Sequence, residues 1–139
     1  EIVEEAGREN NLIFGLSTEE VSALAESYRP LDYYESVPAL KRVVDSLVDG
    51  SFDDGGSGVF REIHDSLLHG LGWEQADQYF VLADFESYRE AQEEAAKLFQ
   101  DEDVFAQMCI RNLLRSSKFS SDRSIEDYVN EIWHVEKID

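Results

Sequence analysis

The spacing of apolar residues constrains the fold of this chain more than any other feature. They recur at three- and four-residue steps, the period of one face of an α-helix. The clearest stripe consists of Val37, Leu40, Val43, Val44, Leu47 and Val48. Pro38 suits the first turn of this helix, and Gly50 suits the position just past its end. Similar stripes predict about six helices along the chain.

Capping signals indicate where the other helices begin. Ser17 and Glu20 have the spacing of a capping box, and the helix that follows is expected to end at Pro30. A third apolar stripe runs from Val59 to Leu68, and its helix is expected to end at Gly70 or Gly72. The residues expected to cap the later helices are Asp84, then Asp101 or Asp103, and finally Ser121 or Ser124.

Two short segments have a β-like pattern instead. Leu12-Ile13-Phe14-Gly15 is apolar on both faces, which is typical of a strand buried inside a parallel sheet. Tyr79-Phe80-Val81-Leu82 is a second candidate. The sequence therefore predicts a mostly α fold with one or two short strands. A length of 139 residues fits one domain. Since such a strand would have unpaired edges here, we expect the chain to self-associate, by strand exchange or helix swapping.

Composition excludes several functional classes. The net charge of −19 comes from 12 basic and 31 acidic residues, so a nucleic-acid phosphate backbone would be repelled. Cys109 is the only cysteine, which favours a reducing cytoplasm. No apolar run reaches the roughly 18 residues of a membrane span, and no signal-peptide pattern is present. Because the sequence starts at Glu1 without Met, we expect a processed chain or part of a longer protein.

A search for catalytic or metal-binding motifs yields no candidate site. Residues 49–60 resemble a calcium-binding loop, but Asp54 and Phe60 stand where an EF-hand requires Gly and Glu. The glycine-rich run 55–58 lacks the Lys-Ser/Thr of a phosphate-binding loop. The only histidines are His64, His69 and His134. His64 and His69 are five positions apart rather than the four of a helical zinc motif, and Cys109 adds no partner of known spacing. Residues 86–94 contain many carboxylates, expected on a solvated helix face.

One charged cluster keeps more than one interpretation. Arg111, Arg115, Lys118 and Arg123 are a third of the basic residues, within thirteen positions that contain one acid, Asp122. The cluster could bind an anion or a partner. Alternatively, Arg111 and Arg115 favour a helix C-terminus and Arg123 pairs within the final loop. A third interpretation is docking against another part of a larger enzyme.

Several segments resemble, in order, the C-terminal end of the α-glucan phosphorylases. The matching segments are Glu1–Gly7, Asn10–Gly15, Tyr33-Tyr34-Glu35, Ala83-Asp84-Phe85 with Tyr88 and Gln92, Ser117–Ile125, Tyr128, and Ile132-Trp133. Together they cover the whole chain. The resemblance implies that residues 1–139 are a single partial domain, the C-terminal part of a Rossmann-like α/β domain of a GT-B-type glycosyltransferase, whose last helices return toward the N-terminal domain.

The resemblance also implies an activity of the complete enzyme, which we do not expect of this chain alone. Family members release α-D-glucose 1-phosphate from α-1,4-glucans, using pyridoxal 5′-phosphate on a lysine in a Gly-Thr-Gly-Asn-Met-Lys motif. None of Lys41, Lys97, Lys118 and Lys137 lies in such a motif. We therefore expect no catalytic, cofactor-binding or metal-binding residue here, no cofactor in this chain, and the remainder of the phosphorylase chain as its partner. The alternative is a stand-alone acidic helical protein-interaction domain.

Overall fold

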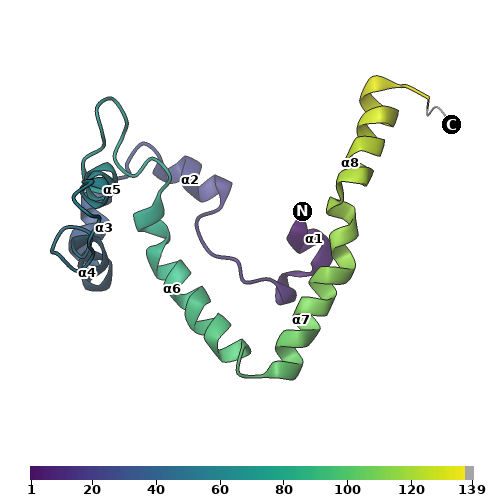
Figure 1. Cartoon of the computed structure of the whole chain (residues 1–139), viewed down its shortest axis with the longest axis horizontal. Helices are drawn as coiled ribbons and strands as arrows, with labels where there is room; N and C mark the ends of the chain where they lie inside the picture. The colour runs from purple at the N-terminus through teal and green to yellow at the C-terminus, as the bar shows by residue number, and fades with distance from the viewer. Residues whose placement is uncertain (137–139) are drawn as a thin grey trace. The chain divides into compact units, whose positions relative to one another are not determined.

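The computed structural model describes residues 1–136, so Lys137 lies outside the described residues. Within that range the chain is helical and contains no β-strand. It divides into two compact units (Figure 1). Unit 2 is Phe14–Gln92, and unit 1 joins Glu1–Ile13 to the residues from Glu93 onward.

Unit 2 contains the hydrophobic core. Its helices are α2 (Thr18–Leu24), α3 (Pro30–Ser36), α4 (Pro38–Asp45), α5 (Val59–Leu68) and the first part of α6 (Val81–Leu98). Helix α3 packs against α4 and α5. The four buried apolar residues are Leu40, Val44, Leu68 and Leu82. The stripe predicted for residues 37–48 is therefore confirmed only in part. Leu40 and Val44 point inward, toward Leu68 of α5 and Leu82 of α6. Val43 is 51% exposed, and α4 ends at Asp45, before Leu47 and Val48.

Most of the helix caps and helix boundaries predicted for this part of unit 2 are confirmed. Ser17 and Glu20 form the predicted capping box, with the Glu20 N–H donating to Ser17 Oγ at 3.2 Å and the Ser17 N–H donating to Glu20 Oε2 at 2.7 Å. Helix α5 covers Val59–Leu68 as predicted. Pro30 was expected to end the preceding helix, but α2 ends at Leu24 and Pro30 begins α3. Its fixed φ suits a first helical turn equally well.

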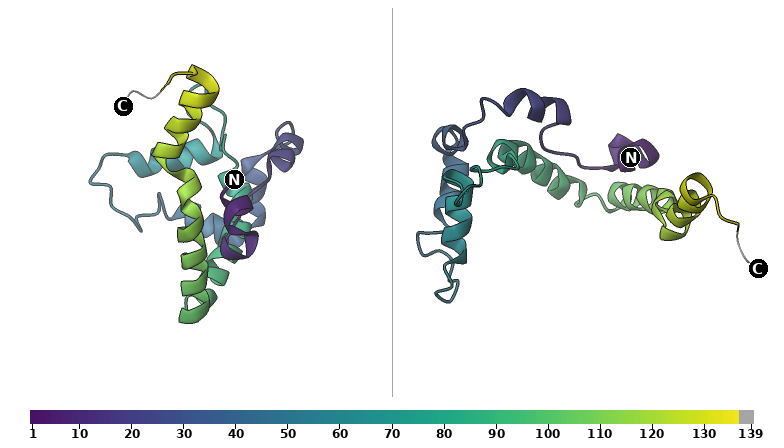
Figure 2. Two further views of the ribbon diagram at one scale, coloured as in Figure 1. Left: turned by 90° about the vertical axis from the view of Figure 1, so that its right-hand side faces the viewer. Right: turned by 90° about the horizontal axis from the view of Figure 1, so that it is seen from above.

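Unit 1 is built around helix α7 (Glu102–Arg115). Its other elements are α1 (Ile2–Ala6), η1 (Arg8–Asn10), the end of α6, η2 (Ser116–Phe119), α8 (Ser121–Asp127) and η3 (Tyr128–Trp133), which has π-helical geometry. Helix α1 and η1 lie beside α7 (Figure 2). The Asn112 amide donates to the carbonyl oxygens of Asn10 at 2.7 Å and Met108 at 3.0 Å, which ties the N-terminal segment to α7.

Neither predicted strand forms within residues 1–136. Residues 12–14 are irregular, and the side chains of Ile13 and Phe14 are half exposed rather than buried. Residues 79–82 cross from a turn into α6, which begins at Val81. A strand requires a neighbouring strand to pair its backbone groups, and the described residues provide none.

Two predicted caps are also wrong. Asp84 lies inside the first turn of α6, and Asp77 binds the N-terminal N–H groups of that helix instead. Helix α8 is capped by Ser120, whose Oγ accepts from the Arg123 N–H, rather than by Ser121 or Ser124. The Asp101 cap of α7 is confirmed, with its Oδ1 accepting from the Val104 N–H at 3.1 Å.

Candidate functional site

The predicted absence of a metal site was based on motif spacing. Among the described residues, no group of three or more His, Cys, Asp or Glu side chains could hold a metal ion. The His64 and His69 rings have centroids 6.5 Å apart, and His64 Nδ1 lies 2.9 Å from Asp65 Oδ1. Likewise, no helix within residues 1–136 is long and apolar enough to cross a membrane.

The acidic loop of residues 51–58 directs its carboxylates at its own backbone. Asp49 Oδ1 accepts from the Ser51 N–H at 2.8 Å, and Asp53 Oδ1 accepts from the Gly55 N–H at 2.8 Å. Asp54 Oδ1 accepts in the same way from the Gly56 N–H at 3.0 Å. These are the side-chain turns that Asp commonly forms, and they leave the carboxylates dispersed along the loop rather than convergent.

Three members of the basic cluster have carboxylate partners in unit 1. Lys118 bonds Glu5, Arg111 Nη1 lies 3.6 Å from Glu9 Oε1, and Arg123 Nη1 lies 2.6 Å from Asp127 Oδ2. The bond from Lys118 holds the pKa of the Glu5 carboxyl below its ordinary value, and the same bond raises the pKa of Lys118. These partners favour internal pairing over an anion site.

The described lysines do not fit a Schiff-base role. A lysine that attacks a carbonyl needs a lowered pKa, but a hydrogen bond to Tyr34 and another to Asp45 raise the pKa of Lys41. The pKa of Lys118 is raised as well. Lys97 lies in the exposed last turn of α6. The residues present therefore do not match a site for pyridoxal phosphate, and no step through that cofactor is assigned to them.

A polar network that the sequence did not predict centres on Asp77. This side chain is buried, and its carboxylate accepts from the N–H groups of Val81 at 2.9 Å and Leu82 at 2.8 Å. The Tyr28 hydroxyl donates to the same carboxylate. Burial, reinforced by this bond and by the charge of Asp77, raises the pKa of Tyr28. The network joins the segment between α2 and α3 to the start of α6, so its role is to position elements.

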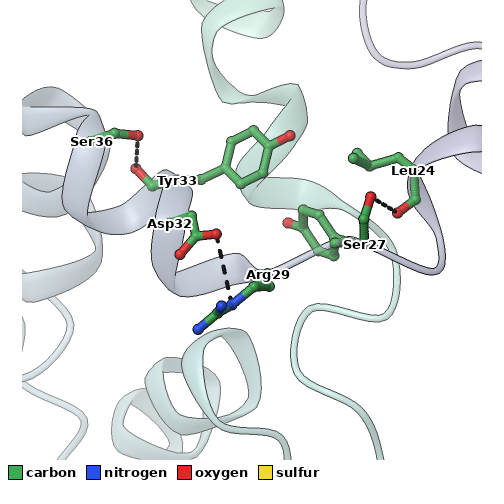
Figure 3. Close-up of a pocket in the computed structure, with 7 residues that line it drawn as sticks. Leu24, Ser27, Arg29, Asp32, Tyr33 and Ser36 are labelled. Carbon is green, nitrogen blue, oxygen red and sulfur yellow. Dashed lines mark hydrogen bonds and ion pairs between the residues drawn. The ribbon is translucent and has the colours of Figure 1, made fainter.

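A small open hollow lies between the end of α2 and α3 (Figure 3). It encloses about 290 Å³. Its lining combines aromatic, charged and hydroxyl groups, from Leu24, Ser27, Tyr28, Arg29, Asp32, Tyr33 and Ser36. Figure 3 shows Arg29 facing Asp32, with 3.8 Å between Nε and Oδ2. Sequence reasoning missed this hollow because its residues form no recognised motif.

A second site-like feature joins two of the family-like segments. The Leu16 N–H donates to Asp84 Oδ1 at 2.8 Å, and the Gly15 N–H donates to Ser87 Oγ at 3.0 Å. The Phe14 and Tyr88 rings pack edge to face, with centroids 5.0 Å apart. Residues distant in sequence thus meet on one face of α6. The donors are already satisfied within the chain, so the feature is structural.

Comparisons with known proteins agree on one family. Residues 1–135 match the carbohydrate phosphorylase family. A glycogen phosphorylase of Synechocystis sp. is 42% identical over 99% of this chain. The muscle form of Bos taurus glycogen phosphorylase is 39% identical over 98% of the chain, and the Homo sapiens brain form is 39% identical over all of it. The chain spans 16% of the length of each of these relatives. These matches do not favour the alternative of a stand-alone interaction domain.

Proposed function

The chain belongs to the carbohydrate phosphorylase family, and we propose that it forms the C-terminal segment of an α-glucan phosphorylase. The observation that carries the proposal is the match of nearly the whole chain to a sixth of each relative. In this proposal the segment supplies no reacting group. It completes and supports a domain whose substrate and cofactor sites are formed by the rest of the protein.

The exposed apolar residues of unit 1 support this role. No residue of α7 or α8 is fully buried. Leu113 is 72% exposed, Leu114 70%, Ile132 62% and Trp133 55%. Apolar residues exposed in this number commonly mark surfaces that another protein segment covers. We infer that the remainder of the phosphorylase chain covers these side chains.

The segment Leu12–Phe14 supports the same proposal. Its three backbone N–H groups have no hydrogen-bond acceptor among the described residues. Its sequence has the pattern of a strand that is apolar on both faces, and the side chains of Ile13 and Phe14 are half exposed. We propose that this segment becomes a strand when the other strands of a Rossmann-like GT-B domain lie beside it, because they would satisfy these donors.

The activity follows from the family. The complete protein is proposed to cleave α-1,4-glucans with phosphate, in the cytoplasm, and to release α-D-glucose 1-phosphate. Pyridoxal 5′-phosphate would be bound by a lysine outside this chain. The chain alone is expected to show neither phosphorolysis nor the absorbance of a pyridoxal Schiff base.

Complementation tests the proposal. The complete phosphorylase would be compared with a form that lacks the present 139 residues, and with that form co-expressed with this chain. We expect glucose 1-phosphate release only in the first and third samples. Full activity of the shortened enzyme would refute the proposed supporting role, and pyridoxal absorbance of this chain that survives dialysis would refute the absence of a cofactor site.

A further inference from the structure

We propose that the hollow between α2 and α3 binds one glucosyl ring of an α-glucan. Identification of the ligand as an α-glucan rests on the proposed function, whereas its class, a neutral sugar ring, follows from the lining. The hollow belongs entirely to unit 2.

Two aromatic rings give the hollow a preformed apolar surface. The Tyr28 and Tyr33 rings have centroids 5.4 Å apart and planes inclined by 49°. Tyr28 also packs against Phe80, with centroids 4.5 Å apart, and its hydroxyl is bonded to Asp77. Tyr33 packs against the hydrophobic core. Rings fixed in this way lose little freedom on binding, and the apolar C–H face of a sugar can pack against them.

The charged groups beside these rings select for a neutral ligand. Arg29 and Asp32 lie side by side, but at 3.8 Å their pairing is loose, and their side chains are 75% and 64% exposed. Both groups can therefore hydrogen-bond a ligand without losing a strong partner. Together they carry no net charge. An anion would be repelled by Asp32 and a cation by Arg29, whereas each sugar hydroxyl can accept from the guanidinium and donate to the carboxylate.

The serines strengthen this polar side. The Ser27 Oγ donates to the Leu24 carbonyl at 3.3 Å, and the Ser36 Oγ donates to the Tyr33 carbonyl at 3.4 Å. Both bonds use the hydroxyl hydrogen, which leaves oxygen lone pairs to accept from a ligand. The volume of about 290 Å³ is just below the roughly 300–1,000 Å³ typical of ligand sites. That size suits a single ring rather than a buried chain of sugars.

The test is a titration of the isotopically labelled 139-residue chain with maltose, followed by amide chemical shifts. We expect saturable shifts centred on residues 24–36, with a Kd of about 1–10 mM. Inorganic phosphate at equal ionic strength should not shift these signals. Because Tyr33 contributes to the core, the primary variant is the surface pair Arg29→Ala/Asp32→Ala, which should weaken maltose binding at least tenfold.

The matched control is Glu86→Ala/Arg89→Ala, which removes another Arg–acid pair at the same i,i+3 spacing in unit 2 and should leave maltose binding unchanged. Absence of saturable shifts at residues 24–36, or equal loss in both double variants, would overturn the proposal. So would phosphate binding in place of maltose. The two experiments can fail separately. Restored activity without maltose binding refutes this site alone. Maltose binding without restored activity refutes the proposed parent function and leaves the hollow as a site for a neutral sugar ring.

Discussion

Replacing Asp77 with alanine is expected to destabilise unit 2 by about 4 kcal/mol, more than any cap substitution alone. This free-energy cost is the sum of three contributions. The helix α6 N–H groups of Val81 and Leu82 lose their acceptor, which typically costs about 0.5–2 kcal/mol. The half-buried Tyr28 hydroxyl loses its partner, at about 1–3 kcal/mol. Alanine must also adopt the φ of +42° found at this position, which costs roughly 1–2 kcal/mol.

Other substitutions separate these contributions. Asp77→Asn keeps an acceptor oxygen and tolerates the left-handed conformation, so its expected cost is about 1–2 kcal/mol. Tyr28→Phe removes the hydroxyl, and in that background Asp77→Ala should cost about 1–2 kcal/mol less because no hydroxyl is stranded. The control is Asp101→Ala, an exposed cap with one bond to Val104, for which about 1 kcal/mol is expected.

The assay is urea unfolding followed by circular dichroism, with hydrogen exchange of the Val81 and Leu82 amides as the local readout. Alkaline pH gives an independent check. Because the pKa of Tyr28 is raised above its ordinary value of 10.0, its contribution is complete below pH 10 and is lost as pH rises further. Tyr28→Phe should abolish that loss. The reasoning is refuted if Asp77→Ala costs no more than Asp101→Ala, or if the Tyr28→Phe background changes nothing.

Three further substitutions test other parts of the structure. Glu5→Gln should reduce the loss of unfolding free energy at acid pH. The pKa of Glu5 is lowered, so its pairing with Lys118 contributes fully above pH 4.5 and is lost as pH falls through the folded-state pKa. If the free energy of unfolding depends on pH in the same way in the variant and the parent chain, this pairing is contradicted. Gly15→Ala should cost more than Gly55→Ala in urea unfolding, since both have positive φ but only at Gly15 would a Cβ meet a neighbour, Asp84 Oδ2, at 2.9 Å; equal costs would show that this contact is not constraining. Trp133→Ala should shift the unfolding midpoint of the complete protein by the equivalent of about 3–5 kcal/mol but barely affect this chain, where Trp133 is 55% exposed; a large loss of turnover at unchanged melting temperature would instead assign Trp133 a direct role.

The sequence predicted those features that depend on neighbouring residues. The Ser17–Glu20 capping box and the buried positions Leu40 and Val44 follow from spacing within a few turns. The cap of α8 was misplaced by one residue, from Ser121 to Ser120. Helix boundaries are usually uncertain at that level, because adjacent serines can serve the same N–H groups.

Features that depend on distant residues could not be predicted. Glu5 and Lys118 are 113 positions apart, and no periodicity relates them. Asp77 caps α6 from a turn in which it has positive φ, and its acceptance of the Tyr28 hydroxyl crosses 49 positions. The strand prediction for residues 12–14 failed for the opposite reason. The local pattern is strand-like, but pairing requires segments that the described residues do not contain.

The two units differ in how they are stabilised, and that difference bears on the proposed role. Unit 2 buries Leu40, Val44, Leu68 and Leu82. Within the described part of unit 1, no apolar side chain is fully buried, and Asn112 and Lys118 connect α1 and η1 to α7 and η2 through polar bonds. Exposed ion pairs each contribute only about 0–1 kcal/mol, whereas burial of one large apolar side chain contributes about 1.5–3 kcal/mol. Polar contacts therefore join the elements of unit 1 to one another, while covering its apolar residues would supply most of its stability. This agrees with the proposed role of a supporting segment in a longer phosphorylase chain.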